Sequence, residues 1–151
     1  MEPQVGHKFP SLVLEGPKYE KVRVPEDFHG KNVVLSWFPY AFSPVCDTQL
    51  AEFARIHTEF THLDATVVAV SCDHWYSNVA YQASLKAPYP ILSDWYRTEA
   101  KKLAIFDEPK QRSGRAIYVL DKEGVLRWKQ TYPTSVCPKA EEFLPTLKGL
   151  A

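Results

Sequence analysis

The sequence has 151 residues, and its 18 basic and 18 acidic side chains give a formal net charge of zero. This balance argues against a nucleic-acid-binding surface or a polybasic membrane-binding face, and no apolar run is long enough to cross a bilayer. The N-terminal residues lack the pattern of a secretory signal, so we expect a cytoplasmic protein that folds as one domain over residues 1–151 without disulfides.

The first half of the chain predicts strands that alternate with a helix. Gly16 and Pro17 separate two short segments that are typical of a hairpin. The unbroken apolar run from Asn32 to Phe38 indicates a strand that is buried on both faces. Apolar residues then recur at helical spacing as far as Phe60. In chain order we expect strands at 11–14, 19–24, 32–38 and 65–70, with a helix from Cys46 to Phe60 before the last of them.

The second half predicts further helices and a second hairpin. Ser77 is a candidate N-cap for a helix that ends before Lys86, and Asp121 to Gly124 form a good hairpin loop. Pro145 is unfavourable within the last helix. We expect helices at 77–85, 98–103 and 138–147, strands at 91–93, 116–120 and 125–129, a polar loop at 107–113 and a linker at 131–136. This order predicts a thioredoxin-like α/β fold, with a central mixed sheet flanked by helices and an N-terminal β-hairpin extension.

Cys46 lies between the buried strand and the predicted helix, in the helix's first turn. Unpaired backbone N–H groups and the helix dipole favour an anion there, so the position suits a thiolate nucleophile. Pro39 and Pro44 restrict the shape of the loop, and Ser43 lies three residues before the thiol. Taken alone, a cysteine in a helix is more often a small buried apolar residue.

The residues around Cys46 resemble the signature of the peroxiredoxin family. Pro39-x-x-x-Ser43-x-x-Cys46 matches the family pattern Pro-x-x-x-Thr/Ser-x-x-Cys. Four further segments resemble family motifs in the right order: VGHKFP (5–10), VVAVSCD (67–73), PILSDW (90–95) and RAIYVLD (115–121). Each segment is weak alone, but together they cover nearly the whole chain, so it is identified as a member of the peroxiredoxin family, nearest the short one-cysteine or atypical two-cysteine bacterial types.

The resemblance implies a role for each matching residue. Cys46 is similar to the peroxidatic cysteine, whose thiolate attacks a peroxide and becomes sulfenic acid. Ser43 matches the residue that hydrogen-bonds the peroxide, and Pro39 matches the residue that shields the thiol from water. Arg115 matches the arginine beside the thiolate. An arginine remains cationic and offers several donors, so it suits this role physically.

Two further residues are candidates for supporting the site. Gln49 stands where many members of the family have Glu, so it keeps an acceptor for Arg115 but lacks the charge. Trp95 is a candidate for packing near the site, with core packing as the alternative. The serine at position 43 is also rarer than threonine in the family and should hold its χ1 angle less stiffly.

The two remaining cysteines, Cys72 and Cys137, leave open how the Cys46 sulfenic acid is reduced again. Cys72 follows an apolar strand and is expected to be buried and inert. Cys137 precedes Pro138 near the expected start of the last helix, and Ser-Val-Cys-Pro resembles the surroundings of the resolving cysteine in two-cysteine peroxiredoxins. The alternative is a one-cysteine mechanism, in which an external thiol reduces Cys46.

The resemblance predicts a thiol peroxidase that reduces hydrogen peroxide or organic hydroperoxides without a metal or other cofactor. The expected partners are an external thiol reductant of the thioredoxin, glutaredoxin or mycoredoxin type and a second copy of the chain in a homodimer. A redox sensor or chaperone would use the same thiol, so it remains an alternative. A thioredoxin-like disulfide oxidoreductase is disfavoured, because no second cysteine lies near Cys46.

Overall fold

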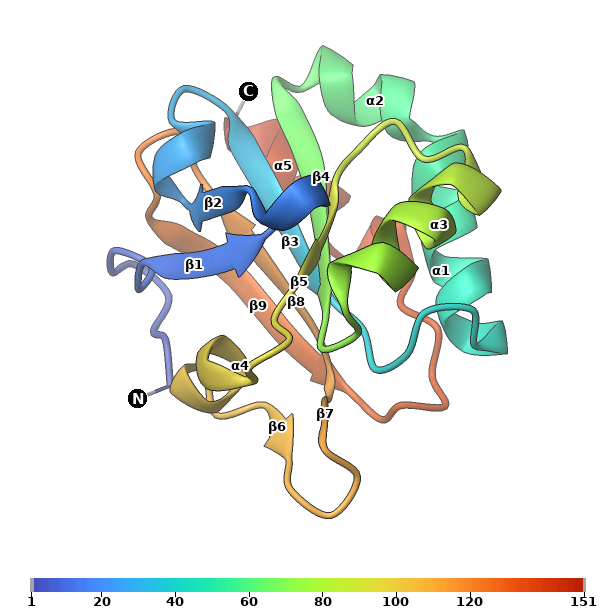
Figure 1. Ribbon diagram of the computed structural model, residues 1–151. Coiled ribbons are helices and arrows are strands. Elements are labelled where there is room, and N and C mark those ends of the chain that lie inside the picture. Colours follow the sequence, from blue (N-terminus) through green and yellow to red (C-terminus); the bar gives the residue numbers. More distant parts are fainter. Residues whose placement is uncertain (1, 151) are drawn as a thin grey trace.

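A computed structural model describes residues 2–150, and its main feature is a mixed sheet with strands in the order β2-β1-β5-β4-β3-β8-β9 (Figure 1). Strands β3, β4 and β5 are parallel, and every other neighbouring pair is antiparallel. The strand bounds are β1 Leu12–Glu15, β2 Lys21–Val24, β3 Asn32–Trp37, β4 Ala65–Ser71, β5 Ile91–Ser93, β8 Arg115–Leu120 and β9 Leu126–Tyr132. The expected N-terminal hairpin is therefore correct, and it extends one edge of the sheet.

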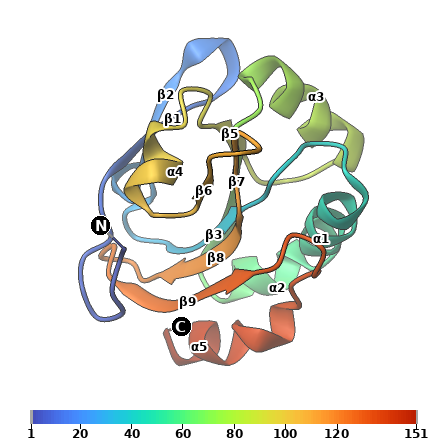
Figure 2. The same cartoon turned by 90° about the horizontal axis from the view of Figure 1, so that it is seen from below.

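Helices cover both faces of this sheet. Helices α1, α2, α3 and α5 lie over one face, whereas α4 lies on the other beside β1 and β2 (Figures 1 and 2). The α-helices are α1 Pro44–Arg55, α2 His57–His62, α3 Trp75–Leu85, α4 Thr98–Lys102 and α5 Leu144–Leu150, and the 3-10 helices are η1 Pro17–Tyr19, η2 Glu26–Phe28 and η3 Ala140–Glu142. None of the helices within residues 2–150 has the length and apolar character needed to cross a membrane.

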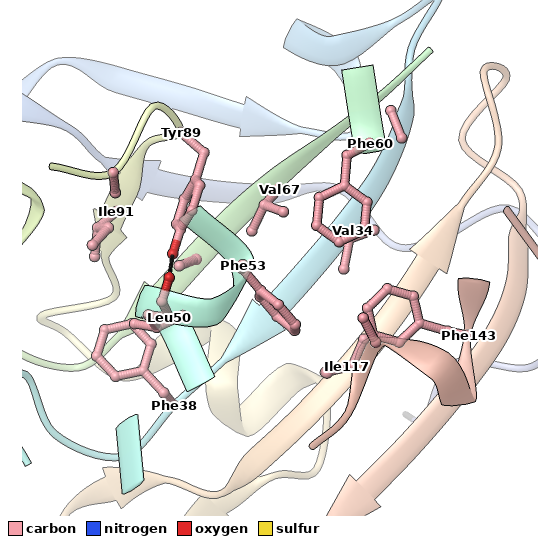
Figure 3. Packing of buried hydrophobic residues seen from close by; sticks show 14 of the residues in the cluster. Val34, Phe38, Leu50, Phe53, Phe60, Val67, Tyr89, Ile91, Ile117 and Phe143 are labelled. Atoms are coloured by element: carbon pink, nitrogen blue, oxygen red, sulfur yellow. Dashed lines mark hydrogen bonds between the residues drawn. The ribbon is translucent and has the colours of Figure 1, made fainter. Parts of the chain in front are cut away.

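The two faces of the sheet have separate apolar cores. Side chains alternate along a strand, so Val34 packs under α1, α2, α3 and α5, while its neighbours Val33 and Leu35 pack on the side of α4. We call the first core the helix-side cluster. Figure 3 shows this cluster, in which Phe53 meets Phe60 and Phe143 edge to face. Burial on both faces explains why the central strands are almost wholly apolar.

Tyr89 fixes α1 to the sheet through one buried polar contact. Its hydroxyl donates to the Leu50 carbonyl at 2.6 Å (Figure 3), and burial raises the pKa of the phenol. We expect Tyr89→Phe to lower the free energy of unfolding by about 1 kcal/mol, because the lost hydrogen bond is a single neutral one. Urea denaturation measures the change, and Tyr19→Phe, at a side chain that is 52% exposed, is the control. Equal stability of both variants would contradict this assignment.

Two expected helices differ from the structure. The helix from Cys46 to Phe60 is interrupted at Ile56, where α1 ends and α2 begins, and Phe53 and Phe60 still pack in the same cluster. The helix expected at 77–85 begins at Trp75 instead. Its N-cap is His74, whose Nδ1 accepts from the Tyr76 N–H at 3.3 Å, so the expectation that Ser77 is the cap was wrong.

The C-terminal region also differs. The predicted helix at 138–147 is replaced by η3 and by α5, in which Pro145 lies in the first turn and so breaks no helical hydrogen bond. The linker expected at 131–136 starts later, because β9 continues to Tyr132 and pairs there with Arg115.

The polar loop predicted at 107–113 is in fact a small ribbon. Strands β6 (Phe106–Asp107) and β7 (Arg112–Ser113) pair antiparallel, and the Ser113 hydroxyl donates to the Phe38 carbonyl at 3.0 Å. Asp107 and Arg112 form an ion pair across the ribbon, and Ser113 bonds the loop after β3, so polarity was a poor guide to its conformation.

Candidate active site

Cys46 lies where the sequence places it, in the first turn of α1. The chain leaves β3 at Trp37, and Ser43 is the N-cap residue, with an extended backbone. Pro44 begins the helix, where its missing N–H costs nothing. The Cys46 side chain has no solvent exposure and packs within the helix-side cluster. The thiol is therefore both shielded from water and close to unpaired N–H groups of the helix.

Arg115 is the first residue of β8, and it reaches the thiol directly. Because β8 pairs antiparallel with β3, its first residues lie beside the end of β3, near the start of α1. Arg115 Nη2 donates to Cys46 Sγ at 3.3 Å and to the Thr134 carbonyl at 3.0 Å. The side chain is only 2% exposed. A buried guanidinium in this position places a fixed positive charge and N–H donors against the sulfur.

Gln49 holds Arg115 from one turn further along α1. Its Oε1 accepts from Arg115 Nη1 at 2.6 Å, and its Nε2 donates to the Ser36 hydroxyl at 2.8 Å. The amide thus orients the guanidinium without neutralising it, so the positive charge remains available to an anion at the sulfur. Ser36 was not predicted as a site residue, and its part in the site depends on its contact with Gln49 in the folded chain.

A small hollow of about 180 Å³ opens beside Arg115, and we call it the thiol hollow, although Cys46 itself is fully buried and is not part of its lining. Its lining includes Pro39, Ser43, Arg112, Arg115 and Thr134. Arg115 Nε is buried and has no hydrogen-bond partner among the described residues. A ligand oxygen that enters the hollow would therefore meet an unused charged donor.

Ser43 and Pro39 both border the thiol hollow, but in different ways. The Ser43 hydroxyl donates to the Tyr40 carbonyl at 2.8 Å and makes no cap bond to the helix. The hydroxyl oxygen can still accept a hydrogen bond from another donor. To donate to a peroxide, the hydroxyl hydrogen must rotate away from the Tyr40 carbonyl. Pro39 is buried and closes one wall.

Trp95 does not pack in the core, the alternative expected for it, and its support of the site around Cys46 stays a prediction. Its ring is 40% exposed and lies under the Arg97 guanidinium, with 5.1 Å from Cζ to the ring centroid. It borders a second hollow, on the other side of Pro39 and Tyr40.

The other two cysteines have different surroundings. Cys72 is 3% exposed, and burial raises the pKa of its thiol to about 12, as expected of an inert residue. Cys137 is half-buried, and burial raises the pKa of its thiol as well. Cys137 does not lie at the start of a helix, because η3 begins only at Ala140. Arg115 lowers the Cys137 pKa and Cys46 raises it, so the three groups lie within electrostatic range.

Comparison with known proteins identifies the family and the fold of this chain. The model of the AhpC/TSA family matches residues 5–129. The chain belongs to the AhpC/TSA family. It is 32% identical to peroxiredoxin 1 of Caldanaerobacter subterraneus subsp. tengcongensis over 97% of this chain and 71% of that protein. It is 30% identical to a peroxiredoxin of Hyperthermus butylicus, of which it spans 66%.

A solved structure agrees with the family assignment. The crystal structure of Enterococcus faecalis AhpC superimposes with a TM-score of 0.84 at 25% identity, over 97% of this chain and 92% of that one. A cysteine-to-serine mutant of peroxiredoxin 6 of Arenicola marina has a TM-score of 0.89 at 22% identity, over 97% of this chain and 73% of that one, and supports the fold. The thioredoxin-like fold expected from the sequence is confirmed. As a peroxiredoxin, the protein is a thiol-dependent peroxidase with a peroxide substrate and a thiol reductant.

Proposed function

We propose that this peroxiredoxin reduces hydrogen peroxide and organic hydroperoxides through Cys46. The observation that carries the proposal is the 3.3 Å contact between Arg115 Nη2 and Cys46 Sγ in a fully buried site. The thiolate attacks one oxygen of ROOH, the O–O bond breaks, and Cys46 becomes sulfenic acid (S–OH). The leaving RO⁻ takes a proton and departs as ROH.

Arg115 has two tasks in this step. Before attack its positive charge favours the thiolate, and during attack its donors follow the charge that builds on the leaving oxygen. The unpartnered Nε is the donor free for that oxygen. Thr134 and Gln49 fix the guanidinium, so little reorganisation is needed at the moment of reaction.

The neighbouring residues complete the proposed site. Ser43 offers its hydroxyl to the peroxide after turning from the Tyr40 carbonyl. Pro39 keeps bulk water from the sulfur. The direct test is consumption of hydrogen peroxide by the purified protein with an excess of dithiol. Stoichiometric oxidation without turnover would favour the alternative role of a redox sensor, whereas no peroxide consumption at all would refute the proposal.

Cys137 is the proposed resolving cysteine. Its thiol lies within electrostatic range of Cys46 and Arg115, on the segment whose Thr134 carbonyl binds Arg115. Attack of the Cys137 thiol on the Cys46 sulfenic acid would form a disulfide and release water. Because Cys46 is fully buried, the first turn of α1 must open locally for the two sulfurs to meet.

A thiol count tests this role. One equivalent of peroxide should remove both the Cys46 and the Cys137 thiol from the wild-type protein and leave Cys72 free. Cys137→Ser should lose only one thiol, and Cys72→Ser is the matched control that should still lose two. Loss of a single thiol in the wild-type protein would instead mean a one-cysteine mechanism with an external reductant of the thioredoxin, glutaredoxin or mycoredoxin type.

The proposed assembly is a homodimer. Phe42, Tyr76 and Tyr96 are 54%, 64% and 73% exposed, and they follow the parallel strands β3, β4 and β5. The carboxyl ends of parallel strands meet at one edge of a sheet, so these rings gather beside the candidate site. Exposed aromatic side chains are enriched at protein interfaces.

Light scattering after gel filtration tests this assembly. The wild-type protein should have the mass of a dimer, and Tyr96→Glu should shift it to a monomer. Val13→Glu, at an exposed position on β1, should leave the dimer intact. A monomeric wild-type protein would refute this part of the proposal.

A further inference from the structure

The second hollow, which we call the arginine hollow, lies next to the thiol hollow. It has a volume of about 290 Å³, and its walls include Tyr40, Trp95, Arg97 and Arg112. Pro39, Tyr40 and Arg112 line both hollows. A molecule in the arginine hollow therefore lies against residues that also line the thiol hollow, where the peroxide is proposed to bind.

Arg112 has more hydrogen-bonding capacity than the protein uses. Its side chain is only 12% exposed, and the guanidinium lies over the Tyr40 ring at 5.0 Å. Its one ion-pair partner in residues 2–150 is Asp107, at 3.5 Å from Nε, and Nε has no hydrogen-bond partner there. Leaving a largely buried cation without hydrogen bonds is costly, so the position fits a ligand that supplies an acceptor.

Arg97 brings a second guanidinium to the same hollow. It is held over the Trp95 ring by hydrogen bonds to the Trp95 and Gln111 carbonyls, the latter at 3.2 Å from Nε. The one carboxylate in the lining is Asp73, whose Oδ2 already accepts from the Ala41 N–H and the Ser71 hydroxyl at 2.8 Å each. The lining thus brings two guanidiniums against one engaged carboxylate, while Asp107, outside the lining, offsets part of the Arg112 charge through its 3.5 Å contact with Nε. The lining itself favours an anion.

On the basis of the proposed peroxidase function, we propose that the arginine hollow binds the carboxylate of an organic reactant of Cys46. Guanidinium groups hold carboxylates through paired N–H donors, and the Tyr40 and Trp95 rings offer apolar walls to the body of the molecule. The reactant is either a hydroperoxide that carries a carboxylate or a thiol that carries one. Arg112 is then the residue that sets this specificity, because it alone of the two arginines borders both hollows.

The test compares matched reactants in each half-reaction. For oxidation of Cys46 the pair is 4-(2-hydroperoxypropan-2-yl)benzoate and neutral cumene hydroperoxide, and for reduction of the sulfenic acid it is 3-mercaptopropionate and 2-mercaptoethanol. In the half-reaction whose reactant occupies the arginine hollow, the wild-type protein should react faster with the carboxylate than with its neutral counterpart. Arg112→Gln should lower this ratio of kcat/KM values or rate constants roughly tenfold or more. Arg112→Lys should restore part of it. Arg23→Gln removes the same charge at the far edge of the sheet and should leave the preference unchanged.

Direct binding makes the test independent of turnover. The wild-type protein should bind 3-phenylpropionate more tightly than 3-phenylpropanamide, and Arg112→Gln should bind the two alike. The inference is overturned if Arg112→Gln changes neither this binding difference nor the preference in either half-reaction. If the wild-type protein consumes peroxide but shows no such preference, the inference fails and the proposed function stands. If it binds the carboxylate but consumes no peroxide, the proposed function fails and binding at the arginine hollow stands.

Discussion

Replacing Cys46 by Ser is expected to lower peroxide reduction by at least about 10³-fold, because a serine hydroxyl stays protonated and attacks an O–O bond poorly. The fold should survive. Serine is close to cysteine in size, and its oxygen can accept the hydrogen bond that Arg115 Nη2 gives to the sulfur. We expect a loss of about 1 kcal/mol in the free energy of unfolding. Steady-state peroxide consumption and urea denaturation measure the two effects.

Cys72→Ser is the matched control for this variant. Cys72 is buried like Cys46, but its raised pKa and its place at the end of β4 give it no part in the proposed reaction. It should keep nearly full activity at a similar cost in stability. If Cys46→Ser retained activity and Cys72→Ser lost it, the nucleophile would have been wrongly assigned.

Replacing Arg115 by Met is expected to lower kcat/KM for hydrogen peroxide by roughly 10²–10³-fold, the usual effect of losing one charged donor aimed at a developing anion. Methionine fills much of the same volume but cannot donate to Cys46, Gln49 or Thr134. The rate constant for alkylation of Cys46 by iodoacetamide should change as well, because the sulfur loses the cation and the donor in contact with it. A merely structural role would leave that rate constant unchanged.

Two further variants sharpen this result. Arg115→Lys keeps the charge but cannot make three directed hydrogen bonds at once, so its activity should lie between those of Arg115→Met and the wild-type protein. Arg127→Met removes an exposed arginine from β9, where it pairs with Asp121, and should leave activity unchanged. Equal losses in Arg115→Met and Arg127→Met would show that net charge matters rather than the contact with Cys46.

The central sheet could be predicted because its strands are buried on both faces. Strands β3 and β4 are mostly apolar and almost wholly buried, and in a chain of this length that pattern indicates strands covered by helices on both faces. The ends of elements were less predictable, since they depend on contacts made in the folded state. His74 caps α3 through a side-chain acceptor, and β9 extends to Tyr132 because Arg115 lies opposite.

The same contrast holds for the active site, where residues with a local sequence signal could be predicted and residues placed by the folded chain could not. Cys46 and its helix start could be predicted from local sequence, and the part of Arg115 came from the family resemblance. Ser36, Thr134 and Arg112 were not predicted, because a serine in a strand, a backbone carbonyl and an arginine in a polar segment have no local signature. Each gains its place only when β3, β7 and the segment after β9 come together.

The most direct test of the account is to locate the first oxidised atom. The protein is mixed with one equivalent of hydrogen peroxide in the presence of dimedone, which traps sulfenic acid, and its peptides are analysed by mass spectrometry without reduction. We predict that Cys46 alone carries the dimedone adduct, or that it is found in a disulfide with Cys137. An adduct on Cys72 or Cys137 with Cys46 still a free thiol would contradict the central claim that Cys46 is the attacking nucleophile.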